Sequence, residues 1–85
     1  MDAIQVLGLS AGTITAITFL PQVIRIWKTR SAKDISLFML LLLILGVSMW
    51  LTYGILVKDA AIIYTNSSVL LMSFIMLYFK WRFNK

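Results

Sequence analysis

The chain has 85 residues, of which 61% are hydrophobic, and it carries a formal net charge of +5. A soluble domain of this length buries too little surface to hide so many apolar side chains, so the composition excludes an ordinary soluble fold. Three apolar runs, residues 3–27, 37–57 and 60–79, cover nearly the whole chain, and each has roughly the 20 residues needed to cross a hydrocarbon core. The sequence therefore predicts an all-α membrane protein in which residues 1–85 form one bundle of three transmembrane helices.

The basic residues predict the orientation in the membrane. Only Lys58 falls on one side, whereas the other seven flank the two helix ends that three crossings place on the opposite side: Arg25, Lys28, Arg30, Lys33, Lys80, Arg82 and Lys85. Because Lys and Arg are enriched on cytoplasmic flanks, we expect the amino terminus outside and the carboxyl terminus in the cytoplasm. These bases are placed to meet anionic lipid, so nucleic acid is not an expected partner.

The first run carries two features that contact with lipid does not require. Gly8 and Gly12 form a small-xxx-small pair, which lets another helix approach closely. Further along, four polar residues fall within about 80° of helical rotation and form what we call the polar stripe. Its members are Thr15, Thr18, Gln22 and Arg25. Interhelical hydrogen bonding and the lining of a solute pathway both explain this stripe.

Pro21 lies within the same helix. It lacks an amide donor and clashes with the carbonyl of Ile17, so the helix is expected to bend or loosen there. Gln22 is placed to satisfy backbone groups that a bend would free. We therefore predict a hinge at Pro21 and Gln22, with the segment below it acting as a short movable arm.

A short polar segment, residues 28–36, connects the first two helices on the cytoplasmic side. Its length favours an arrangement in which these two helices are neighbours. Ser36 or Asp34 is expected to cap the second helix, because a side-chain oxygen at that position accepts from free amides of the first turn.

The second helix changes character in its outer half. Gly46, Trp50, Tyr53 and Val57 recur at i, i+4, i+7 and i+11, within about 60° of one face. Tryptophan in membrane proteins is usually found in the interfacial belt, and Trp50 lies too deep for that role. Gly54 favours either the outer turn or a close helix contact.

Asn66 follows the outer turn at the same distance at which Trp50 precedes it. Each lies about seven residues from the turn at Val57, Lys58 and Asp59, and therefore on the order of 10 Å inside the same membrane face. An asparagine in hydrocarbon is costly unless it is paired, so Asn66 is either a helix–helix contact or part of a binding site. The indole at the same depth favours the site.

Three helices do not supply enough walls for a solute pathway. The charge bias predicts that two copies associate in parallel about a twofold axis along the membrane normal, giving six helices. Two Trp50 indoles would offer apolar faces to the C–H groups of a sugar ring, and two Asn66 amides would hydrogen-bond its hydroxyls. The sequence shows no ionisable residue in the middle of a helix, no metal-ligand cluster and no nucleophile–base pair. We therefore expect no enzyme activity, no cofactor and no metal.

These residues resemble a known family. The run Thr18-Phe19-Leu20-Pro21-Gln22-Val23, followed by Trp50-x-x-Tyr53-Gly54, Asp59 and Asn66, is similar to the bacterial SemiSWEET sugar transporters of the SWEET/MtN3 group in the PQ-loop clan. The resemblance implies a parallel homodimer in a bacterial inner membrane that moves mono- or disaccharides by alternating access. It also implies that Trp50 and Asn66 contact the sugar, that Pro21 permits bending, and that Tyr53 with Asp59 closes the outer mouth.

The outer mouth departs from the family pattern. Similar proteins often have an arginine two residues before the aspartate, where this chain has Val57, with Lys58 beside it. We expect an outer gate of Tyr53, Val57, Lys58 and Asp59, and the contribution of an ion pair stays open. The lack of ionisable residues inside the membrane predicts uncoupled facilitated diffusion. Two alternatives remain: a PQ-loop carrier of another small neutral solute or an amino acid, and a holin-like pore former.

Overall fold

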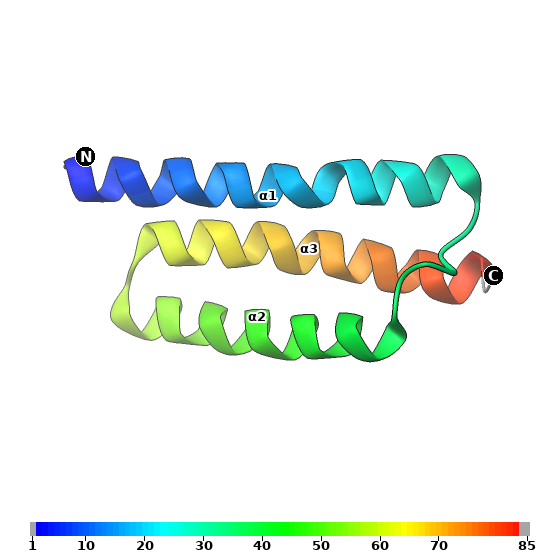
Figure 1. Ribbon diagram of the computed structural model, residues 1–85. Helices are drawn as coiled ribbons and strands as arrows, with labels where there is room; N and C mark the ends of the chain where they lie inside the picture. Colours follow the sequence, from blue (N-terminus) through cyan, green and yellow to red (C-terminus); the bar gives the residue numbers. More distant parts are fainter. Residues whose placement is uncertain (1, 84–85) are drawn as a thin grey trace.

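The computed structural model describes residues 2–83, which form three α-helices (Figure 1). Helix α1 spans Ala3–Thr29, α2 spans Leu37–Val57 and α3 spans Ala60–Phe83. Each is long and apolar enough to cross a membrane, which confirms the predicted fold class. The bundle measures 45 × 21 × 14 Å.

Each helix begins at a side-chain cap. Asp2, Ser36 and Asp59 each accept a backbone amide from three residues further along, at 2.7, 3.2 and 3.1 Å. Ser36, and not Asp34, therefore caps α2, which decides between the two expected caps. Such caps satisfy amides that have no partner within the helix and typically contribute about 1 kcal/mol each.

Helix α3 lies between α1 and α2 (Figure 1), so the expectation that the first two helices are neighbours is wrong. Within residues 2–83, no Cα of α1 lies within 8 Å of a Cα of α2. Residues 30–36 extend up to ~3.5 Å each, which is enough to pass the end of α3, because packed helix axes are only ~8–10 Å apart. Helices α2 and α3 are joined by Lys58 and Asp59 alone, which forces them to be adjacent.

The small-residue contact predicted on α1 is confirmed. A Cβ atom added to Gly8 would lie 2.8 Å from the Cβ of Ala61, and one added to Gly12 would overlap the side chain of Thr65. Both glycines therefore face α3 and let the two backbones approach closely.

A buried cluster lies at the end of the bundle where the connecting segment passes from α1 to α2. It joins Ile26 of α1, Leu40 of α2 and Met76 of α3 to Ala32 of the connecting segment. Ala32 is only 1% exposed, and its carbonyl accepts a hydrogen bond of 2.9 Å from Lys80 Nζ. The connecting segment is thus fastened to α3 as it passes from α1 to α2.

Candidate functional site

A close contact near the outer turn sets the register between α2 and α3. A Cβ atom added to Gly54 would lie 2.5 Å from Cγ2 of Ile62, so Gly54 serves a close helix contact. In an antiparallel pair, four residues back along α2 and four residues forward along α3 both lead ~6 Å deeper. Those positions are Trp50 and Asn66. The structure therefore places the two residues at one level on neighbouring helices.

Trp50 lies on an open face of α2. Its side chain is 58% exposed, and its ring meets that of Tyr53 edge-on, with centroids 5.6 Å apart and an interplanar angle of 89°. A shallow hollow of about 370 Å³ is lined by these two residues together with Gly46 and Met49. Val57 is exposed. The predicted face of Gly46, Trp50 and Tyr53 is thus present, and Met49 is an additional member.

Asn66 is partly buried beside α2. Its Nδ2 donates to the carbonyl oxygen of Ile62 in its own helix at 2.9 Å, which leaves the amide oxygen and one N–H for another partner. It does not line the hollow beside Trp50. Within residues 2–83 no hydrogen bond joins Asn66 to another helix, so the protomer does not use this side chain to hold helices together.

All four members of the polar stripe are exposed. Thr18 Oγ1 donates to the carbonyl of Thr15 at 2.6 Å, and Arg25 pairs with Asp34 of the connecting segment at 3.6 Å. In the part of the chain that the structure describes, no hydrogen bond links the stripe to α2 or α3. Helix packing within the protomer therefore does not explain these polar side chains.

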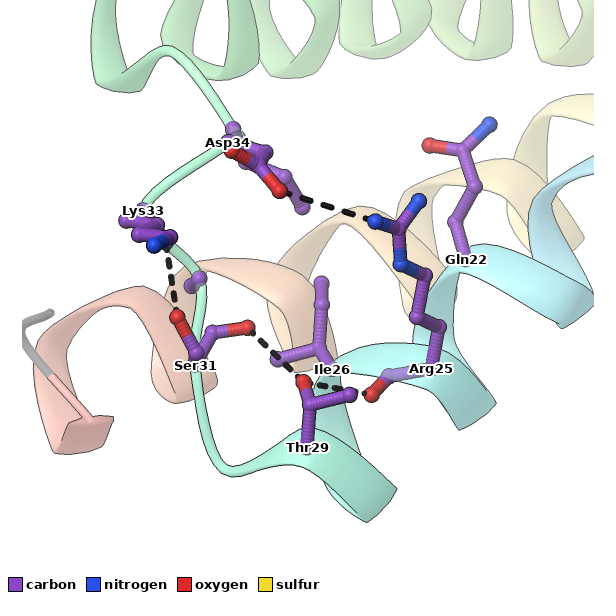
Figure 2. Close-up of a pocket in the computed structure, with 9 residues that line it drawn as sticks. Gln22, Arg25, Ile26, Thr29, Ser31, Lys33 and Asp34 are labelled. Carbon is purple, nitrogen blue, oxygen red and sulfur yellow. Dashed lines mark hydrogen bonds and ion pairs between the residues drawn. The ribbon is translucent and has the colours of Figure 1, made fainter.

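The polar stripe and the Trp50 face open on the same side of the bundle. On α1, the polar stripe lies about 100° around the helix axis from the side that contacts α3. On α2, the Trp50 face lies about 100° from the side that contacts α3, in the same sense when each helix is viewed from its amino-terminal end. Because the two helices run in opposite directions on opposite flanks of α3, equal rotations bring both faces to one side. Figure 2 shows Arg25 extending from α1 toward Asp34 of the connecting segment, with the Gln22 side chain extending from the same helix beside it.

The predicted hinge at Pro21 and Gln22 lies on α1. Helix α1 continues through Pro21 to Thr29, and both Pro21 and Gln22 are exposed. Pro21 cannot donate to the carbonyl of Ile17, so one helical hydrogen bond is missing at this point. The movement of the inner arm stays a prediction.

At the outer turn, Lys58 and Asp59 serve the backbone. Lys58 has a left-handed conformation, with φ 57° and ψ 44°, and ends α2. The Asp59 carboxylate caps α3. The ion pair found within residues 2–83 joins Arg25 to Asp34, at the opposite end of the bundle from this turn. The gating role of Tyr53, Val57, Lys58 and Asp59 remains a prediction.

A second hollow, which the sequence did not predict, lies where the open face meets the connecting segment. It measures about 380 Å³ and lies between the inner end of α1 and residues 31–35 (Figure 2). Arg25 and Asp34 lie on its wall and form the ion pair. One sequence signal pointed to it, because Asp34 is one of only three acidic residues in the chain and is surrounded by bases.

The fold and the open polar and aromatic face define a small multi-pass membrane protein. The family model of the PQ loop repeat matches residues 3–63. Together with the relatives described below, this match shows that the chain belongs to the PQ-loop family and, within it, to the SemiSWEET group.

Two relatives, each named sugar transporter SemiSWEET, align with most of this chain. The relative from Bradyrhizobium diazoefficiens is 42% identical over 80 residues, which are 94% of this chain and 93% of the relative. The relative from Leptospira biflexa is 41% identical over 76 residues, 89% of each chain. A crystal structure described as a bacterial homologue of SWEET transporters superposes with a TM-score of 0.92 at 35% identity, covering 96% of this chain and 99% of that one.

Proposed function

We propose that this chain is a sugar transporter that acts as a parallel homodimer and moves mono- or disaccharides by alternating access. The observation that carries the proposal is the exposed indole of Trp50, held at the level of Asn66 on an open face of the bundle. The names of its relatives, sugar transporter SemiSWEET, support the same substrate class.

A second copy supplies the missing wall of the pathway. Helices α1 and α2 each pack against α3, and within residues 2–83 they make no close backbone contact with each other, so one protomer leaves its polar and aromatic face open. The charge bias orients every copy alike, so two copies meet in parallel, with their open faces across a twofold axis. The amino termini then lie outside and the carboxyl termini in the cytoplasm of a bacterial inner membrane.

The chemistry of the face suits a neutral, hydroxyl-rich solute. Each indole offers a flat surface to the C–H face of a sugar ring, and each Asn66 has an acceptor and a donor free for hydroxyls. No Asp, Glu, His, Lys or Arg occurs in residues 3–24, 37–57 or 60–79. Without such a group to carry a coupling proton, transport proceeds as uniport down the sugar gradient. Pro21 permits the inner arm to bend, and the residues of the outer turn close the outer mouth.

The test is uptake of a panel of labelled sugars and amino acids into proteoliposomes. We expect saturable uptake of one or a few sugars, inhibited by the same unlabelled sugar. Leakage that neither saturates nor discriminates between solutes would instead show a pore former. Selective uptake of an amino acid would show a PQ-loop carrier of another class.

A further inference from the structure

The hollow at the inner end of the open face has the size and composition of a small-molecule site. Its volume, about 380 Å³, falls within the ~300–1,000 Å³ typical of such sites. Ile26 and Ala32, both buried, form its apolar part. Gln22, Arg25 and Asp34 place polar groups around it (Figure 2).

These polar groups are complementary to hydroxyls. A hydroxyl both donates and accepts, and the wall of the hollow offers a guanidinium that only donates, a carboxylate that only accepts and an amide that does both. Arg25 and Asp34 are 3.6 Å apart, and their side chains are 75% and 73% exposed. A charge-assisted hydrogen bond measures ~2.7–2.9 Å, so this pair is loose enough to share its free positions with a bound molecule.

The hollow lies on the pathway proposed above, but well below the level of Trp50. The contact of Gly12 with Thr65 places residue 13 of α1 level with Asn66. Gln22 and Arg25 are therefore ~14–18 Å deeper along α1, because each helical residue adds ~1.5 Å. The hydroxyls of the polar stripe occupy the interval between the two levels.

We infer that this hollow is a second sugar-binding site, at the inner mouth of the pathway, in which the Arg25 and Asp34 side chains hold sugar hydroxyls. The inference rests on the proposed function. A sugar leaving the level of Trp50 and Asn66 passes along the polar stripe and binds here before it enters the cytoplasm. Lys33 lines the hollow as well, so its charged side chains are two bases and one acid, and phosphate is the competing ligand that the test includes. The Asp34 carboxylate, 3.6 Å from the Arg25 guanidinium, offsets part of the positive charge.

The chain has no cysteine, so a single introduced thiol reports on the hollow without background. Ser31 lines the hollow, and Ser31→Cys changes one oxygen to sulfur; Thr29→Cys provides a second position on the same wall. Lys28→Cys is the matched control, because Lys28 borders a neighbouring apolar surface of α1 and does not line the hollow. The rate of maleimide labelling is measured in nanodiscs with glucose, sucrose, mannitol or inorganic phosphate, with and without Trp50→Ala.

The sugar that the proteoliposome panel selects should slow labelling of Ser31→Cys several-fold, and should do so equally in the Trp50→Ala background. Asp34→Asn should remove this protection, and Lys28→Cys should react at the same rate throughout. Protection that vanishes with Trp50→Ala would overturn the inference, since it would come from the upper level. Protection by phosphate and not by sugar would identify an anion site instead. Sugar transport without protection refutes the inner site alone, whereas a failure to transport any sugar refutes the proposed function and this inference together.

Discussion

Replacing Gly54 by Ala is expected to destabilise the bundle by about 1–3 kcal/mol, the usual cost of an overpacked contact. The new Cβ would lie 2.5 Å from Cγ2 of Ile62, 3.0 Å from its Cβ and 3.3 Å from the amide nitrogen of Ile63. A different rotamer of Ile62 moves its Cγ2 but leaves its Cβ and the backbone nitrogen where they are. Helices α2 and α3 must therefore separate slightly.

The matched control is Gly46→Ala, on the same helix. Nothing lies within 4 Å of a Cβ added there, so Gly46→Ala should leave the stability unchanged or raise it by up to about 1 kcal/mol, because Ala is the better helix former. Thermal unfolding in detergent, followed by circular dichroism, compares the two variants. In a chain of this size 1 kcal/mol corresponds to roughly 4–8 °C, so Gly54→Ala should lower the Tm by at least about 4 °C. If the two variants have the same Tm, whether it equals the wild-type Tm or is lower, Gly54 is not the point at which α2 and α3 are in contact.

Three further predictions concern the proposed transport cycle. Pro21→Ala restores a helical hydrogen bond, so it should slow sugar exchange more than it weakens equilibrium binding; the reverse pattern would make Pro21 part of the binding site. Net uptake and exchange should both proceed without an imposed gradient, and uphill accumulation driven by a pH step or by sodium would contradict uniport. Tyr53→Ala should reduce transport more than Lys58→Ala, because an exposed ion pair at the outer mouth would contribute only ~0.2–1 kcal/mol. A double-mutant cycle with Lys58→Ala and Asp59→Asn, read out as transport rate at low and high salt, tests this. Asn is chosen at position 59 because it keeps the cap on α3. Strong, salt-sensitive coupling between the two changes would show that the ion pair holds the gate.

The helices and their faces were largely predictable. Apolar runs of sufficient length predict the three spans, and the spacing of Gly8 and Gly12 predicts a close helix contact, which α3 provides. The period of the second helix places Gly46, Trp50 and Tyr53 on one face, which the structure shows as an open hollow. These features depend on local periodicity, and one sequence contains that information.

The order of the helices was not predictable from the length of a loop. Residues 30–36 permit α1 and α2 to be neighbours or to be separated by α3, and the choice depends on packing along the whole bundle. One signal was available, because Gly8 and Gly12 in α1 and Gly54 in α2 all contact α3, as expected if the two flanking helices pack against a central one. The inner hollow was missed for a similar reason. Arg25 and Asp34 are nine residues apart and meet only because the connecting segment turns back across the end of the bundle.

Trp50 and Asn66 together are proposed to bind the transported sugar. The most direct measurement is the initial rate of uptake of that sugar into proteoliposomes by Trp50→Ala and Asn66→Ala, at equal amounts of reconstituted, folded protein. Trp50→Ala loses an aromatic stack worth about 0.5–1.5 kcal/mol beyond the buried area, and Asn66→Ala loses hydrogen bonds to sugar hydroxyls. Because twofold symmetry removes each contribution twice, both variants should lose nearly all uptake. Tyr78→Ala on the exposed surface of α3 is the matched aromatic control, and it should keep most of the activity. Uptake by either site variant close to the wild-type rate would contradict the claim.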